Sequence, residues 1–295
     1  MIDATRRLEQ RLYRDVKATC EGYQLLAAGD RIMVCMSGGK DSYTLFYLLT
    51  RMVARLPFAV ELIAVHLDQV QPGYDGSSMR AFLEASGQRY EILREDTYSV
   101  VTSHLPETAT YCSMCSRLRR GILYSAAERL GCNKLALGHH RDDSLETFLL
   151  NLFYSGKLQA MPASYRTDDG RFEVIRPLIE CAESDIAEFA AAQAFPIIPC
   201  NLCGSQDGLK RDAMTALLAQ LEQTNPHIRS VMANALRNVR PTHLLDRDVA
   251  RAWAERPADV RPQTLSTPKP RHAAAEPLVS GGAYPAKVRL PVVTD

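Results

Sequence analysis

The segment SGGKDS, Ser37–Ser42, constrains the fold more than any other part of the chain, because it lies between an apolar run and a helical pattern. Residues 31–36 are strand-like, and residues 43–49 continue as a helix. Two adjacent glycines let successive backbone N–H groups point inward, while the hydroxyls, Lys40 and the helix N-terminus add donors and positive potential. The segment therefore predicts an anion cradle, most simply for phosphate or pyrophosphate.

This cradle differs from the ordinary P-loop. That motif needs a glycine five residues before Gly39, where Val34 stands, and a hydroxyl residue at the position of Asp41. The loop therefore predicts a different phosphate chemistry. The alternative is a glycine-rich strand-to-helix turn that holds no ligand.

The length and composition bound the class of protein. The chain has 295 residues, of which 46% are hydrophobic, enough for one large or two modest domains. No apolar stretch reaches the roughly 18 residues that a membrane-spanning helix needs, and the first residues lack the apolar segment of a secretory signal. We therefore expect a cytoplasmic enzyme with no membrane partner. The net charge of +1 means that any nucleic acid must be held by a local basic patch.

Strand and helix patterns alternate along the first half of the chain. Strands are expected at 31–36, 59–67, 90–93 and 134–138, and helices at about 3–27, 42–55, 77–86 and 116–130. Such alternation predicts an α/β fold with a doubly wound parallel sheet. Ligands of these sheets bind beyond the carboxyl ends of the strands. Ser37, Asp68 and His139 each follow a predicted strand, so we expect them to meet in one crevice.

The predicted organisation has four parts. Residues 1–30 form an N-terminal helical segment, and residues 31–200 form the nucleotide-binding α/β domain. Residues 201–246 form a C-terminal helical appendage. Residues 247–295 carry many prolines and almost no apolar periodicity, so we expect a disordered tail without chemistry.

A second polar cluster, GHHRDDSLET, begins at Gly138, where a strand ends and a helix begins. Asp142 and Glu146 are four residues apart and share one helical face. Carboxylates so placed can hold Mg²⁺ against phosphate oxygens. The alternative is that the two aspartates only cap the helix and favour its dipole.

The eight cysteines include two Cys-x-x-Cys pairs, Cys112 with Cys115 and Cys200 with Cys203, both expected in exposed loops. In a chain without a secretion signal such pairs favour metal or redox chemistry over structural disulfides. Four thiolates suit either one tetrahedral Zn²⁺ or an iron–sulfur cluster. The other four cysteines lie in apolar patterns typical of small buried side chains.

These motifs together resemble a known family. SGGKDS and GHHRDDSLET resemble the two shared motifs of the PP-loop ATP pyrophosphatase superfamily. With YCSMCSRLRRG, which begins at Tyr111, the strand from Ile175, and PCNLCGSQ, which begins at Pro199, the chain resembles the tRNA 2-thiocytidine synthetases over residues 5–246.

The resemblance implies the cofactors ATP, Mg²⁺ and a [4Fe–4S] cluster. It implies that the cluster has three ligands, Cys112, Cys115 and Cys203, which leaves Cys200 over and one iron open. It further implies that a cytidine C2 oxygen at position 32, in the anticodon loop of tRNA, attacks the α-phosphate of ATP. Sulfur from a cysteine desulfurase then displaces AMP. The chain is compatible with a homodimer.

The implied site residues follow from the same motifs. The residues implied to bind ATP and pyrophosphate are Ser37, Gly38, Gly39, Lys40, Asp41, Ser42, Asp68 and His139. The residues implied to be catalytic are Lys40, Asp41 and Asp142, whereas His140 and Asp143 are expected only to support the turn. Arg117, Arg119 and Arg120 are candidates for tRNA phosphate contacts, and Tyr111 for stacking on a base.

Three other functions stay open from the residues. A lysidine synthetase is similar around SGGKDS but needs no paired cysteines. A zinc-bearing 2-thiouridine synthetase would carry a Cys/His cluster at one end of the chain. A zinc-stabilised RNA-binding module with a vestigial nucleotide site is disfavoured by the intact Lys40, Asp41, Asp142 and Glu146. The sequence does not give the set of tRNAs, the sulfur donor or the oligomeric state.

Overall fold

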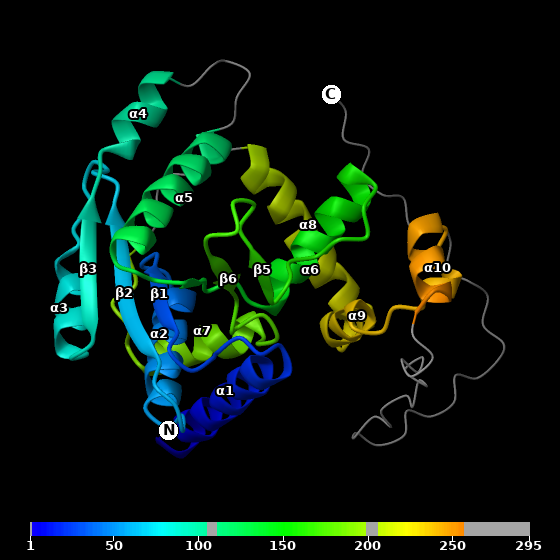
Figure 1. Ribbon diagram of the computed structural model, residues 1–295, viewed down its shortest axis with the longest axis horizontal. Helices are drawn as coiled ribbons and strands as arrows, with labels where there is room; N and C mark the ends of the chain where they lie inside the picture. The colour runs from blue at the N-terminus through cyan, green and yellow to red at the C-terminus, as the bar shows by residue number, and fades with distance from the viewer. Residues whose placement is uncertain (1, 105–110, 199–205, 257–295) are drawn as a thin grey trace. The chain divides into compact units, whose positions relative to one another are not determined.

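A computed structural model describes residues 2–104, 111–198 and 206–256. Its centre is a six-stranded sheet in the order β3-β2-β1-β4-β6-β5 (Figure 1). All neighbours are parallel except β5, which pairs antiparallel with β6 at one edge. The strands are β1 (Arg31–Met36), β2 (Glu61–Asp68), β3 (Arg89–Arg94), β4 (Lys134–Ala136), β5 (Ser164–Arg166) and β6 (Glu173–Ile175). The predicted α/β fold with a doubly wound parallel sheet is confirmed.

Helices cover both faces of this sheet. The helices are α1 (Ile2–Gly22), α2 (Lys40–Val53), α3 (Ser77–Ala85), α4 (Thr97–His104), α5 (Tyr111–Arg129), α6 (Arg141–Leu150), α7 (Glu183–Ala192), α8 (Gln206–Thr224) and α9 (Ile228–Leu236). A π-helical turn, η1 (Asn151–Ser155), continues α6. Among the described residues, none of these helices combines the length and the apolar character needed to cross a bilayer.

Alternation along β1 shows why the chain needs two helical layers. Ile32 and Val34 belong to the larger core, with α1, α2, α3 and α7. Met33 belongs to a second core on the other face, where α5 contributes Ala126 and Ala127. Successive strand residues point to opposite faces, so a strand that is apolar throughout must be covered on both sides.

The helices of the C-terminal appendage pack on α6 in a small separate core. Leu145 and Leu149 of α6 pack against Met214 and Leu218 of α8, and side chains of α9 complete the cluster. The chain divides into two units, residues 1–239 and 240–295. In the described part of the second unit, η2 (Pro241–His243) precedes α10 (Arg247–Ala254), whose N-terminus is capped by Asp246.

The structure differs from the expected elements in four places. Residues 247–254, expected within a disordered tail, form the helix α10. Helix α5 begins at Tyr111, five residues before the expected start, so the pair Cys112 and Cys115 lies on a helix and not in a loop. Cys115 is also buried and not exposed. The short elements α4 and β5 were not expected. The strand expected from Ile175 onward instead covers Glu173–Ile175, because Pro177 lacks the N–H that a continuing strand would need.

Candidate active site

The loop between β1 and α2 has the backbone of an anion cradle. Gly38 has φ of +88°, a conformation that side chains rarely adopt, and Gly39 is the N-cap residue of α2. The Oγ of Ser37 accepts a hydrogen bond from the N–H of Gly39 (3.3 Å), and the Oγ of Ser42 donates to the carbonyl of Gly39 (2.8 Å). Among the described residues no side chain caps α2 at Gly39. The positive end of this helix is therefore available to an anion.

A second loop, between β4 and α6, packs against the first. A Cβ on Gly138 would lie 3.1 Å from both the backbone carbon of Asp41 and the backbone nitrogen of Ser42. His140 is the N-cap of α6, and it forms a reciprocal capping box with Asp143. Because β1 and β4 are neighbours where the strand order reverses, the two loops meet at the topological switch point of the sheet.

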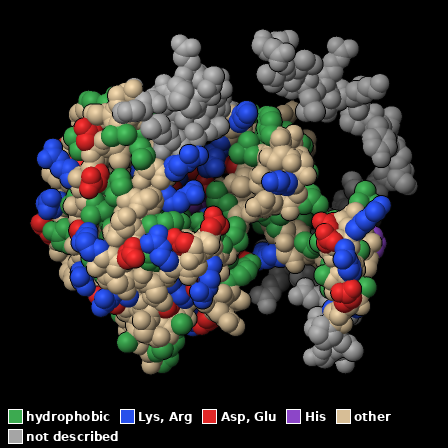
Figure 2. Space-filling view, turned by 45° about the horizontal axis from the view of Figure 1, so that its top comes forward, with side chains coloured by type: hydrophobic (Ala, Val, Ile, Leu, Met, Phe, Trp, Pro, Cys, Tyr) green, Lys and Arg blue, Asp and Glu red, His purple; other side chains and the backbone are tan. Residues whose placement is uncertain are grey.

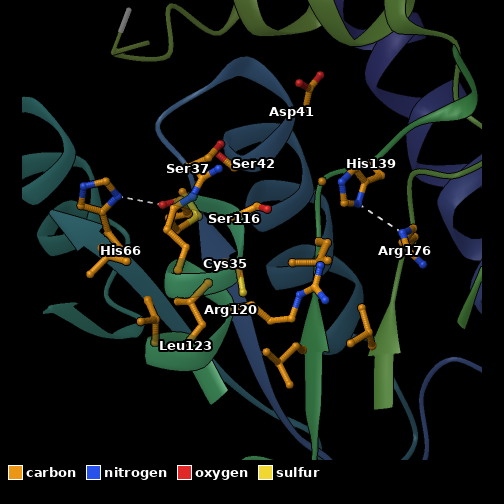
Figure 3. A pocket seen from close by; sticks show the side chains of 18 of the residues that line it. Cys35, Ser37, Asp41, Ser42, His66, Ser116, Arg120, Leu123, His139 and Arg176 are labelled. Atoms are coloured by element: carbon orange, nitrogen blue, oxygen red, sulfur yellow. Dashed lines mark hydrogen bonds between the residues drawn. The ribbon is translucent and has the colours of Figure 1, made fainter. Parts of the chain in front are cut away.

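A cavity of about 460 Å³ opens between these loops and α5. Figure 2 shows a hollow on the face turned to the viewer, bordered by basic side chains. In Figure 3, Ser37 and Ser42 lie together between His66 on one side and His139 with Arg176 on the other. The polar and charged residues of the lining include Ser37, Asp41, Ser42, His66, Gln69, Ser116, Arg119, Arg120, His139, Asp143 and Arg176.

His139 is held in one tautomer. The Nε of Arg176 donates a hydrogen bond to Nδ1 of His139 (3.1 Å), so the neutral ring carries its proton on Nε2. Burial, followed by the positive charge of Arg176, lowers the pKa of His139 to about 4. Arg176 is itself fixed, because it also donates to the carbonyl of Pro162 (2.9 Å). At neutral pH, His139 is therefore an uncharged hydrogen-bond donor in the wall of the cavity.

Lys40 forms ion pairs at the start of α2. Its Nζ lies 3.2 Å from Oδ1 of Asp41 and 3.0 Å from Oε1 of Glu183, the first residue of α7. Burial alone would lower the pKa of Lys40, but Asp41 and Glu183 raise it above its usual value. Burial raises the pKa of Asp41, against the opposing effects of His140 and Lys40. Lys40 is thus fully charged and lies beside the anion cradle.

The structure places Asp142 away from the cavity. Asp142 is buried, and its carboxylate lies 2.7 Å from Nη1 of Arg229 and accepts the backbone N–H of Glu183 (2.8 Å). Burial would raise the pKa of Asp142, but the N–H of Glu183 and the guanidinium groups of Arg141 and Arg229 lower it. Asp142 therefore serves to join α6, α7 and α9.

The other carboxylates of this cluster have different surroundings. Glu146 is buried and accepts a hydrogen bond from Thr215 of α8 (2.6 Å). Asp143 lines the cavity, and its Oδ2 accepts the N–H of His140 (3.0 Å). The i, i+4 pair expected to hold Mg²⁺ is thus used within the protein, and Asp143 is the carboxylate of α6 that reaches the cavity.

Of the remaining predicted residues, some line the cavity and others lie outside it. Arg119 and Arg120 line the cavity, and Arg120 extends from α5 across it (Figure 3), whereas Arg117 lies on the same helix outside the lining. Asp68 is outside the lining as well. Its Oδ1 accepts the N–H of Val70 (2.8 Å) and so shapes the turn after β2.

Of the four paired cysteines, the structure describes one side chain. The thiol of Cys115 donates to Oε1 of Gln69 (3.2 Å), and Gln69 lines the cavity. The side chains of Cys112 and Tyr111, and residues Cys200 and Cys203, lie outside the described part. Among the described residues, no group of three His, Cys, Asp or Glu side chains is arranged to hold a metal ion.

Several residues of the site had no assigned role from the sequence. Glu183 and Arg176 are single charged residues that only the fold brings to the loops. His66 donates from Nδ1 to the carbonyl of Met36 (2.7 Å), and its Nε2 accepts from the hydroxyl of Tyr74. The sequence could have indicated His66 and Arg176 as site residues, because each is a polar residue within or at the end of an otherwise apolar run.

Comparisons with known proteins agree with this geometry. Residues 7–198 match the PP-loop domain family. The tRNA-cytidine(32) 2-sulfurtransferase of Anaeromyxobacter sp. (strain Fw109-5) is 51% identical over 248 residues, which are 84% of this chain and 82% of that protein. The enzyme of the same name from Erwinia tasmaniensis is 49% identical over 243 residues, 82% of this chain and 79% of that protein.

A solved structure has the same fold. The U34-tRNA thiolase NcsA from Methanococcus maripaludis, solved with its [4Fe-4S] cluster, superposes with a TM-score of 0.64. The match covers 79% of each chain at 24% sequence identity. At this identity the likeness concerns the fold alone.

Proposed function

Because the chain belongs to the PP-loop family of tRNA-cytidine(32) 2-sulfurtransferases, we propose that the cavity described above is where ATP activates the target cytidine. The protein is a transferase that thiolates cytidine in tRNA at the expense of ATP. One observation carries the proposal for the cavity. Ser37, Asp41 and Ser42 of the anion cradle line the same cavity as Ser116, the neighbour of Cys115 near the start of α5.

The chemistry has two steps. The cytidine C2 oxygen attacks the α-phosphorus of ATP, the bond from that phosphorus to the bridging oxygen breaks, and pyrophosphate leaves. A hydrosulfide ion then bonds to C2, the C2–O bond breaks, and AMP leaves with the original oxygen. Loss of the proton on sulfur gives 2-thiocytidine. Activation is needed because an oxygen bound only to C2 is a poor leaving group.

The residues of the cavity fit the first step. The N–H groups at the start of α2 bind the departing pyrophosphate, and Lys40 neutralises the charge that develops on it. For this, Lys40 exchanges its ion pair with Glu183 for the phosphate oxygens. His139 donates from Nε2 to a phosphate or carbonyl oxygen and stays neutral while it does so. Arg119 and Arg120 add positive charge along α5 for the RNA phosphates.

Mg²⁺ fits this site through Asp41 and Asp143. Among the described residues, Oδ1 of Asp41 is buried and accepts no hydrogen bond, although Lys40 is nearby, and Asp143 also reaches the cavity. Mg²⁺ is commonly bound by one or two carboxylates together with substrate phosphates, so a complete protein cage is not needed. When bound, it neutralises charge on the phosphates.

The surroundings of Cys115 fit a [4Fe–4S] cluster bound beside the cavity. The thiol of Cys115 is buried next to Gln69, so a thiolate there would be shielded from water and close to the nucleotide. We propose Cys112, Cys115 and Cys203 as the ligands. When bound, such a cluster supplies an open iron that can carry sulfur.

The setting of the reaction belongs to the same proposal. We place the enzyme in the cytoplasm, with a cysteine desulfurase as the source of its sulfur. Each of these can be measured separately from the reaction.

One experiment tests the function directly. Protein reconstituted with iron and sulfide without oxygen is incubated with ATP, sulfide and unmodified tRNA, and the digested nucleosides are analysed by mass spectrometry. The expected product is 2-thiocytidine, with one AMP and one pyrophosphate released for each. Thiolation of uridine, or lysine joined to cytidine, would overturn the assignment.

A further inference from the structure

An exposed group of aromatic and basic side chains lies outside the cavity, where α6 passes into η1. Every residue from 152 to 159 is exposed. Phe153 and Tyr154 are 55% and 54% exposed, Leu158 is 66% exposed, and Lys157 follows on the same loop. The ammonium group of Lys210, from α8, lies 5.2 Å from the ring centre of Tyr154. We call Phe153, Tyr154, Lys157, Leu158 and Lys210 the stacking patch.

The loop that carries the stacking patch is held in shape. Gly156 ends η1 in the left-handed conformation (φ of +61°), which glycine adopts without strain. The backbone N–H of Lys157 donates to the carbonyl of Asn151 (3.0 Å), and the side chain of Asn151 donates to the carbonyl of Gln159 (2.9 Å). Hydrogen bonds thus fix the backbone of the turn that carries the two aromatic rings, so this backbone need not be ordered when a ligand covers them.

The chain segment that carries the stacking patch starts and ends at the cavity wall. Asp143, in the first turn of α6, lines the cavity, and so does Tyr165 of β5. Helix α6 has ten residues, so it rises about 15 Å between the cavity and η1. That is about the length of four stacked nucleotides. One short stretch of RNA can therefore reach both places.

The charge of this segment favours RNA over a second copy of the chain. No Asp or Glu occurs between Glu146 and Asp168, whereas Lys157 and Arg166 do. In a two-fold dimer formed through the stacking patch, the patch would contact the same patch of the second subunit. Lys157 and Lys210 would then lie near the same lysines of that subunit, and this segment would offer no carboxylate to pair with them. Exposed aromatic rings beside lysines are typical of surfaces that stack unpaired bases and bind the phosphates next to them.

We propose that the stacking patch binds unpaired bases of the RNA substrate outside the cavity, with Phe153 and Tyr154 as the stacking platforms and Lys157 and Lys210 on the phosphates. This inference rests on the proposed function for its ligand, an RNA hairpin loop. It assigns to η1 the task of orienting the loop while the target base enters the cavity.

The test measures binding of a fluorescein-labelled RNA hairpin that has the anticodon stem and loop with cytidine at the target position. Phe153→Ala and Tyr154→Ala should each raise Kd about 5- to 150-fold, since stacking of one base contributes that much. Phe153→Tyr keeps the ring and should bind like the wild type. Lys157→Ala should reduce the slope of log Kd against log salt by about 0.7, the contribution of one phosphate on a single strand.

Matched variants on α1 and just after it provide the controls. Lys17→Ala and Tyr23→Ala remove an exposed lysine and an exposed tyrosine from another part of the fold and should leave RNA affinity unchanged. Titration of ATP by calorimetry should give the same affinity in all these variants, because the stacking patch does not line the cavity.

The outcomes are distinguishable. Unchanged Kd in both alanine variants, with normal 2-thiocytidine formation by the wild type, overturns this inference and leaves the proposed function standing. Absence of 2-thiocytidine with the wild type overturns the proposed function and the inference with it. A shift from dimer to monomer on Phe153→Ala, seen by sedimentation, would show a subunit interface and overturn the RNA assignment. Because Lys157 lies on an exposed loop, Lys157→Ala should fold normally. The slope of log Kd against log salt for this variant therefore remains a test even if an aromatic variant folds poorly.

Discussion

The backbone of Gly138 packs directly on the backbone of Ser42, with room for a hydrogen atom but not for a methyl group. A Cβ at Gly138 would lie 3.1 Å from the nitrogen of Ser42. The second loop thus presses on the first turn of α2, where the anion cradle is formed. The geometry of one loop depends on the other.

Gly138→Ala should therefore weaken ATP binding, because the start of α2 must move by a few tenths of an ångström. We expect a rise of about tenfold in the Kd for ATP by calorimetry, in line with the sensitivity of phosphate sites to small displacements.

Gly121→Ala is the matched control for that change. Gly121 lies within α5, and among the described residues no heavy atom of another element lies within 4 Å of the place where its Cβ would stand. The substitution should leave ATP affinity unaltered and stabilise the helix slightly. Equal affinities for the Gly138 and Gly121 variants would contradict the prediction.

Lys40→Ala should strongly slow pyrophosphate release while leaving the cluster spectrum intact. The lysine lies beside the cradle, and loss of one preorganised charge opposite a leaving phosphate costs roughly 10²- to 10³-fold in rate. Release is measured with a coupled phosphate assay in the presence of tRNA, and Lys17→Ala serves as the control. Normal product formation at saturating ATP would show that Ser37–Ser42 does not bind pyrophosphate.

Asp142 and Asp143 should respond differently to the same substitution. Asp142→Asn removes the charge that faces Arg229 and should lower the free energy of unfolding by about 1.5 to 3 kcal/mol, because Arg229 keeps its second partner Glu222. Asp143→Asn should leave the melting temperature nearly unchanged but weaken the Mg²⁺ dependence of ATP binding. Thermal melting and calorimetry separate the two effects. A normal melting temperature for Asp142→Asn would refute the structural role.

Stability should fall with pH below about 6.5 because of His139. The pKa of His139 is lowered from 6.5 to about 4 in the folded protein, first by burial and then by Arg176. Between those pH values the unfolded chain binds a proton that the folded protein lacks, so the free energy of unfolding decreases as the pH falls. Asp143, Arg211 and His140 also act on this ring.

Urea unfolding of the wild type and of His139→Gln measures this contribution. The variant should show a flatter dependence on pH between about 6.5 and 4, and the difference isolates His139 from His66, whose pKa burial also lowers. Parallel curves for the two proteins would contradict the lowered pKa.

Cysteine variants distinguish a cluster from a zinc site. Cys112→Ala, Cys115→Ala and Cys203→Ala should each lose iron–sulfur absorbance, whereas Cys200→Ala should keep much of it. A tetrahedral Zn²⁺ site needs all four thiolates, so Cys200→Ala would then lose as much metal as Cys203→Ala. Iron and zinc are measured on protein purified without oxygen. If Cys200→Ala and Cys203→Ala lose the same amount of bound metal, and that metal is zinc, the cysteines form a structural zinc site and not a cluster.

The sequence predicted the parallel sheet and its two loops because both depend on local patterns. Apolar runs bounded by glycine define β1 and the start of α2 without any knowledge of distant contacts. The role of Asp142 could not be found this way. Its partner Arg229 is 87 residues further along the chain, and nothing local distinguishes Asp142 from Asp143. The start of α5 at Tyr111 was missed for a related reason, because polar residues precede the apolar face of that helix.

Helix α5 gives the site a mechanical property. It has 19 residues, about 28 Å, and one half is fixed in the second core by Ala126 and Ala127, while the other half carries Cys115, whose thiol donates to Gln69 in the cavity wall. A rigid rod anchored at one end transmits a tilt to its far end. A larger side chain at Ala127 would therefore shift the far end of α5 relative to the loop after β1, in addition to the roughly 1 to 3 kcal/mol that overpacking a core costs. A core position far from the cavity can therefore affect the reaction through the orientation of this helix.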